Sequence, residues 1–182
     1  GNYNAAFGAI ALQYNTTGGS NTAIGVFALN SNTTASNNTA VGYQAGYSGT
    51  TSGGNTLLGY QAGYTGQGIS SGSVGYQAGQ SIQGSNSVSI GISAGQSNQG
   101  TGSVAIGGYA GSLTQGMGSV AIGYESGYTG QGSNAVAVGY QAGFANVTGS
   151  SNSIMLGTQA GYNITSGNKT ITSKNISRSI AS

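Results

Sequence analysis

The titratable side chains of this 182-residue chain are too few and too far apart to build a catalytic site within one chain. Glu125 is the single acidic residue, and histidine and cysteine are absent. The basic residues, Lys169, Lys174 and Arg178, all lie close to the end of the sequence. Acid–base catalysis and the usual metal sites need several positioned groups of these kinds. The composition therefore predicts a protein that is not an enzyme, with no catalytic residue, no metal site and no cofactor.

Aromatic side chains are the other groups able to bind a ligand, and they recur at two regular positions. The first aromatic row is Tyr43, Tyr60, Tyr76, Tyr124 and Tyr140. The second aromatic row is Tyr47, Tyr64, Tyr128, Phe144 and Tyr162. Exposed tyrosines suit recognition surfaces, so the rows could form platforms for a glycan or another surface ligand. Their regular spacing also fits rings that stack on one another and fill an interface, and both interpretations stay open.

Both rows belong to a sequence repeat, which is marked by a glycine that follows a pair of small or aliphatic residues. These repeat glycines are Gly8, Gly25, Gly42, Gly59, Gly75, Gly91, Gly107, Gly123, Gly139 and Gly157. The steps between them are 17, 17, 17, 16, 16, 16, 16, 16 and 18 residues. A fixed period over most of a chain indicates one small structural unit stacked many times. We therefore predict about ten coils, and we number positions in each coil from its repeat glycine.

The residues before each repeat glycine alternate in a way that is typical of a short strand. Position −1 is always large and apolar, and position −2 is mostly alanine or serine. Position −3 is valine or isoleucine in the later repeats, and Thr22, Thr39 and Thr56 in the earlier ones. This alternation predicts a strand with one buried face. Glu125 stands at position +2, where other repeats carry glutamine, so we expect it to be an exposed variant of a glutamine ladder.

The rest of each repeat predicts corners and turns. Alanine at position +3 and, in the later repeats, a second glycine at +4 suggest a tight corner, and the remaining polar residues are typical of turns. We predict an all-β fold, a parallel β-solenoid without helices, whose thin core holds alanine, valine and isoleucine. Such a core buries little apolar surface, so we also expect lateral association around a symmetry axis.

The repeat resembles that of a known family of fibrous proteins. The block Ser103-Val104-Ala105-Ile106-Gly107, which recurs at 119–123, resembles the head repeat of trimeric autotransporter adhesins, the YadA-like head. The variants at 21–25 and 38–46 are similar to the same repeat in tail fibres of bacterial viruses. The resemblance implies a left-handed β-roll, a homotrimer around a common axis, and attachment to a surface.

The repeat divides the chain into two predicted parts. Residues 1–163 form the β-roll repeat domain, and residues 164–182 form a non-repetitive basic segment, as a neck or a transition to a further module. No apolar run reaches the roughly 20 residues that span a bilayer, so we expect no membrane span in this chain. Three basic residues in a terminal segment are typical of a solvated tail, and we expect no nucleic-acid partner.

These observations favour a structural and adhesive module of a trimeric surface fibre, from a phage tail or a bacterial adhesin. Its location would be extracellular, on a cell surface or a virion, and its partner a host-surface glycan or protein. One alternative is an extracellular filament subunit that polymerises through the unpaired strand edges of its terminal coils. Another is an ice-binding solenoid that uses the regular threonine array of Thr22, Thr39 and Thr56 beside Asn21, Asn38 and Asn55.

Overall fold

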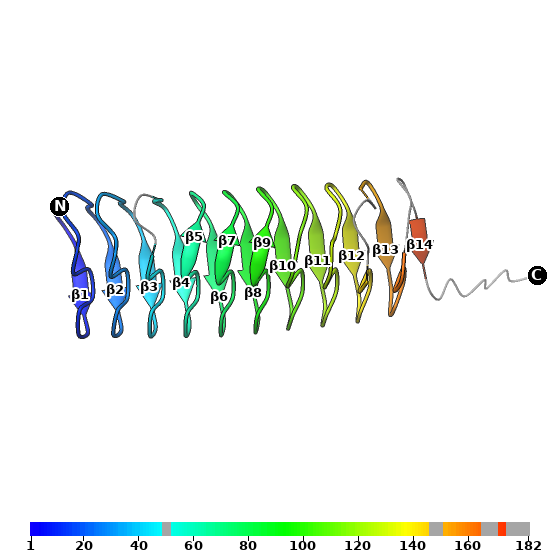
Figure 1. The fold of residues 1–182 in the computed structure, drawn as a ribbon, viewed down its shortest axis with the longest axis horizontal. Helices are drawn as coiled ribbons and strands as arrows, with labels where there is room; N and C mark the ends of the chain where they lie inside the picture. The colour runs from blue at the N-terminus through cyan, green and yellow to red at the C-terminus, as the bar shows by residue number, and fades with distance from the viewer. Residues whose placement is uncertain (49–51, 146–150, 165–170, 174–182) are drawn as a thin grey trace, which may run out of the picture.

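The chain forms a long, narrow β-solenoid (Figure 1). A computed structural model describes residues 1–48, 52–145, 151–164 and 171–173. Within these ranges there is no helix, and every strand is three residues long and pairs in parallel with its neighbours. The prediction of an all-β parallel solenoid is confirmed. The left-handed sense and the three-fold assembly stay predictions that rest on the family resemblance.

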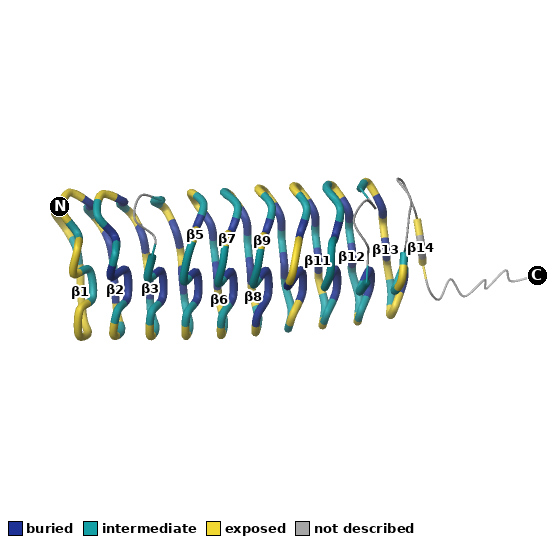
Figure 2. The backbone as a smooth tube through the Cα atoms, viewed as in Figure 1, coloured by how far each residue is buried: buried dark blue, intermediate teal, exposed yellow. Residues whose placement is uncertain are grey.

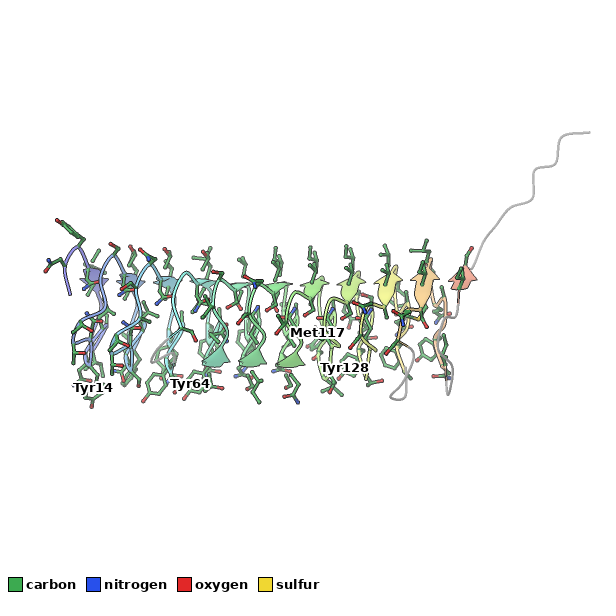
Figure 3. The ribbon with its side chains drawn as sticks, turned by 90° about the horizontal axis from the view of Figure 1, so that it is seen from above. Tyr14, Tyr64, Met117 and Tyr128 are labelled. Carbon is green, nitrogen blue, oxygen red and sulfur yellow. The ribbon has the colours of Figure 1, made fainter. Side chains whose placement is uncertain are left out.

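A long sheet of eleven described strands runs the length of the rod. Its strands, in order, are β1 (Ala5–Phe7), β2 (Thr22–Ile24), β3 (Thr39–Val41), β4 (Thr56–Leu58), β6 (Gly72–Val74), β8 (Val88–Ile90), β10 (Val104–Ile106), β11 (Val120–Ile122), β12 (Val136–Val138), β13 (Ile154–Leu156) and β14 (Ile171–Ser173). A short sheet contains β5 (Thr65–Gln67), β7 (Ser81–Gln83) and β9 (Ser97–Gln99). The two sheets form opposite sides of the rod (Figure 3).

The register of the long sheet follows the repeat. Equivalent residues of successive coils face each other, as Ala105 does with Ala121. β14 adds a further rung, with Ile171 paired to Ile154, so the sheet continues into the segment 164–182 that we expected to be non-repetitive. The three basic residues of that segment lie outside the described residues.

The core contains the small residues of each strand, and this corrects one of our expectations. Alanine or serine at position −2 is buried in most coils, and so is the alanine at position +3 (Figure 2). The large apolar residues at −3 and −1 point outward, so valine and isoleucine do not fill the interior. Successive residues of a strand point to opposite faces of the sheet. The interior of such a narrow coil has room only for the small side chain at position −2, so the larger ones at −3 and −1 face outward.

A ladder of glutamines fills the middle of the core. The coils that begin at Gly59, Gly75, Gly91, Gly107 and Gly123 each carry a buried glutamine at +8, namely Gln67, Gln83, Gln99, Gln115 and Gln131. Each of these amides reaches a main-chain carbonyl; the Gln115 Nε2, for instance, donates to the Val104 oxygen at 2.7 Å. Because the polar groups are paired, a glutamine can be buried at acceptable cost.

The second glycine of these coils lies against the glutamine side chain. A Cβ atom on Gly111 would lie 2.7 Å from the Gln115 Oε1, so the glutamine would have to shift to accommodate a larger residue. In the first two coils Leu12 and Leu29 stand at this position and no glutamine enters. The same core volume is therefore filled by leucine at one end of the rod and by glutamine in the middle.

The repeat glycine is required because successive coils approach closely there. Gly107 has φ +123°, and a Cβ on it would lie 2.6 Å from the carbonyl oxygen of Gly123, the repeat glycine of the next coil. L-residues avoid this backbone region. The glycine recurs in the sequence because the backbones of successive coils are in contact at this position.

Candidate functional site

The outer face of the long sheet is an apolar strip, which we call the apolar face. It is made of the side chains at positions −3 and −1 of each coil. Ile24, Ile90 and Ile122 are among the exposed ones, and Ile24 keeps 42% of its surface accessible. None of the residues at these positions in β1 to β14 is charged. Position −1 is apolar in all ten coils, whereas position −3 is threonine or glycine in β2, β3, β4 and β6 and valine or isoleucine from β8 to β13.

The threonine and asparagine array separates into two faces. Thr22, Thr39 and Thr56 pair with one another on the apolar face. The asparagines beside them point inward and are buried. Their side-chain oxygens accept main-chain hydrogen bonds from the next coil, as the Asn21 Oδ1 does from the Asn38 N–H at 3.0 Å. The asparagines therefore join the coils, and only the threonines are available at the surface.

The first aromatic row consists mainly of stacked rings. The ring centroids of Tyr43 and Tyr60 are 5.4 Å apart, and those of Tyr60 and Tyr76 are 5.0 Å apart with planes 7° from parallel. Tyr124 and Tyr140 stack in the same way at 5.7 Å. Stacking covers the ring faces inside the row, so a ligand meets ring edges along it and a ring face only where the row is broken.

The second aromatic row lies on the side of the rod opposite the long sheet, where Figure 3 labels Tyr64 and Tyr128. Tyr47 stacks on Tyr64 at 5.2 Å, and the rings of Tyr128, Phe144 and Tyr162 follow one another at 5.2 and 4.9 Å. The rings are half-buried. The structure therefore stacks the residues within each predicted row, but each row is interrupted and consists of two separate stretches.

Glu125 belongs to a ladder of amides at position +2. Gln61 donates to Gln44 at 2.8 Å, and farther along the rod the Gln141 Nε2 donates to the Glu125 Oε2 at 2.7 Å. The carboxylate also raises the pKa of the neighbouring Tyr124, chiefly through its negative charge, with burial and its hydrogen bond to that hydroxyl adding to the effect. This places Glu125 where the sequence predicted it, in the glutamine ladder.

Two features escaped the sequence-based prediction. The buried glutamines belong to the polar stretches that we had assigned to turns, and the signal that could have revealed them is the recurring Gly-x-x-x-Gln spacing from 63 to 131. Tyr109 stands one position later than the first aromatic row. Its ring lies 6.0 Å from that of Tyr124, at 81° to it, so the row changes from stacked to perpendicular at this point.

The described residues enclose no cavity, and no cluster of acidic, histidine or cysteine side chains suited to a metal ion occurs among them. None of the described segments is a helix with the length and apolar character needed to cross a bilayer. What the solenoid offers a partner is its extended outer surface. Comparisons with models of protein families, with curated proteins and with solved structures find no match to the chain.

Proposed function

We propose that this chain is a non-enzymatic structural and adhesive module of a trimeric surface fibre, as in phage tail fibres or bacterial adhesins, and that it acts outside the cell or on a virion. The observation that carries the proposal is the apolar face. It runs along all eleven described strands of the long sheet without a charged residue. A surface of this kind is unfavourable in water and is explained if other copies of the chain cover it.

The straight, ladder-like shape of the apolar face supports this interpretation more than its area does. Eleven strands about 4.8 Å apart and three residues wide, at about 3.3 Å each, give a strip of roughly 500 Å². That is within the range of the largest apolar patch on ordinary monomers, roughly 300–600 Å², but here it forms one straight ladder. Three such rods placed around an axis would each bury this face against the other two, in a closed symmetric assembly.

A trimer of this kind would leave the second aromatic row available. The second row lies opposite the long sheet (Figure 3), so it would face outward when the apolar faces meet at the axis. Tyrosine edges and the amide ladder offer both apolar contact and hydrogen bonds, a combination that is common in recognition surfaces. The host-surface ligand of the module would be a glycan or a protein, and the rod itself would act as a rigid spacer.

Sedimentation of two matched double variants tests the assembly. The first, Ile106→Lys with Ile122→Lys, puts two charges on the apolar face in adjacent coils. The control, Thr101→Lys with Met117→Lys, puts two charges in the same two coils at exposed positions away from that face. We expect trimers for the unmodified chain and the control, and monomers for the first variant. An unmodified 17.6 kDa chain that stays monomeric at every concentration would refute the trimer.

Two further observations separate the roles of the module. Binding of the purified trimer to a glycan array or to host cells would support the adhesive role, whereas failure to bind either would leave a pure spacer. Electron microscopy of the same sample should show discrete rods. Filaments of unlimited length would instead support the alternative of a self-polymerising subunit.

A further inference from the structure

The first aromatic row is broken in the middle of the rod. The residues that follow Gly91 and Gly107 are Ile92 and Gly108, where neighbouring coils carry tyrosine. Without a tyrosine at 108, the Tyr124 ring has a stacked partner only on its Tyr140 side. The break thus leaves one face of the Tyr124 ring without a stacked aromatic partner.

Tyr109 lies next to the break, but its ring does not stack on that of Tyr124. It stands at position +2, and its ring lies at 81° to that of Tyr124 with the centroids 6.0 Å apart. The Tyr124 ring lies close to Gly108, because a Cβ on that glycine would be 3.3 Å from the Tyr124 Cδ2. Both rings stay accessible, Tyr109 at 38% and Tyr124 at 47% of their surface. Two perpendicular rings form a corner that two stacked rings cannot form.

The same place holds the chain's only carboxylate. Glu125 occupies position +2 of the next coil, so its backbone lies one strand spacing, about 4.8 Å, from that of Tyr109. It directly follows Tyr124, and its Oε2 accepts the Gln141 amide at 2.7 Å. A carboxylate has about four acceptor positions, so this amide and the Tyr124 hydroxyl leave capacity for another donor. No basic residue occurs between 1 and 168 to neutralise the charge.

From this combination we propose that Tyr109, Tyr124 and Glu125, the Glu125 corner, form a binding site for an organic ammonium group. Aromatic rings attract cations through the negative charge of their faces, and a ring centroid within about 6 Å of the cation is sufficient. The carboxylate supplies the opposite charge, and the exposed parts of the two rings supply apolar contact for the carbon atoms of the ligand. A cationic ligand would gain a charge attraction at this position of the glutamine ladder that a neutral hydrogen-bond donor does not have.

This inference deepens the proposed function, since the ammonium group would belong to the surface on which the fibre attaches. Quaternary ammonium headgroups and protonated amines share this chemistry. A single open corner of this kind binds weakly, and the three copies in a trimer would raise the apparent affinity if their ligands are displayed together.

The test follows the NMR signals of the Tyr109 and Tyr124 rings, assigned with Tyr→Phe variants, while small probes are added to the full chain. The probes are choline for a quaternary headgroup, methylammonium for a protonated amine, and dimethylbutanol as the neutral carbon isostere of choline. We expect both rings to respond to at least one of the ammonium probes and not to the isostere. Which ammonium probe binds more tightly identifies the source of the group.

Two single variants show whether the corner itself is responsible. Glu125→Gln, which restores the residue found in other coils, should weaken the ammonium affinity roughly two- to fivefold, as expected for the loss of an exposed ion pair. Gln77→Glu places a carboxylate in the same ladder beside Tyr76, and it should create no comparable site. Tyr76 is stacked on Tyr60 as Tyr124 is on Tyr140, but it lies next to Ile92 and Ser93 in the following coil in place of a tyrosine such as Tyr109. Equal binding of the isostere, no response to either ammonium probe, or an equally strong site in Gln77→Glu would each overturn the proposal.

The outcome does not depend on the oligomeric state. A monomer that binds an ammonium probe at the Glu125 corner would refute the trimer and leave the site standing. A trimer whose rings respond to no probe would refute the site and leave the fibre module standing.

Discussion

Replacing a repeat glycine by alanine is the most direct test of how the coils are stacked. In Gly107→Ala, the backbone must hold an L-residue at φ +123°, a strained conformation that costs roughly 1–3 kcal/mol. The added Cβ would lie 2.6 Å from the Gly123 carbonyl oxygen, and moving the next coil to relieve that overlap costs roughly 1–3 kcal/mol more. We therefore expect a loss of about 4 kcal/mol in the free energy of unfolding, a large share of the roughly 5–15 kcal/mol of a typical domain.

Two other glycines provide matched controls for this variant. Gly102 has φ +67° but nothing within 4 Å of the added Cβ, so Gly102→Ala should cost only the roughly 1–2 kcal/mol of a left-handed conformation. Gly72 has open space and no unusual φ, so Gly72→Ala should be neutral or stabilising by up to about 1 kcal/mol.

Urea unfolding followed by both circular dichroism and tyrosine fluorescence measures all three variants, and agreement of the two signals indicates a single transition. The expected order of stability is Gly72→Ala, then Gly102→Ala, then Gly107→Ala. If Gly107→Ala unfolds within about 1 kcal/mol of Gly102→Ala, the coils are not in the close contact described above and the explanation of the repeat is wrong.

Three further changes test the core and the carboxylate. Gln115→Ala removes a buried amide that is hydrogen-bonded to a main-chain carbonyl at 2.7 Å, and it should lower the free energy of unfolding in urea by about 3 kcal/mol. Gln141→Ala in the outer ladder should lower it by less than about 1 kcal/mol. Equal losses would contradict a structural role for the buried ladder. Ser126 carries a buried hydroxyl that lacks a partner among the described residues, and Ser126→Ala should raise the thermal midpoint, as relief of roughly 1 kcal/mol or more would. Glu125→Gln should lower the pKa of Tyr124 toward that of an ordinary tyrosine, read from its ring signals during a pH titration, because the charge that raises it is gone; an unchanged titration would assign the shift to another cause.

The positions of the strands in the long sheet could be predicted from the sequence alone. Equal spacing places Ala105 against Ala121 in any parallel stack, and a slip by one residue would exchange every inward and outward side chain. Periodicity therefore determined both the strands and their register. It also placed Glu125 correctly in the glutamine ladder.

Which side chains of each strand point into the core could not be predicted in the same way. Alternation separates Ala105 from Ile106 but does not say which one points inward, and the usual rule that large apolar residues are buried gave the wrong answer. The rule fails because the interior of one coil is too narrow, and because Gln115 already occupies it. The perpendicular arrangement of Tyr109 and Tyr124, which Phe27 and Tyr43 also adopt, arises where an aromatic residue stands at position +2, and a pattern averaged over ten repeats does not contain this departure.

The uniform register has a consequence for how such a rod changes its length. Deleting residues 92–107, one full period, would bring Ala121 onto Ser89, a pair of the same kind as the present Ala105 and Ser89. The rod would shorten by one strand spacing, about 4.8 Å, and its cross-section would stay the same. Recombination between neighbouring repeats in a gene can therefore lengthen or shorten the rod in whole steps, without any compensating change in the core.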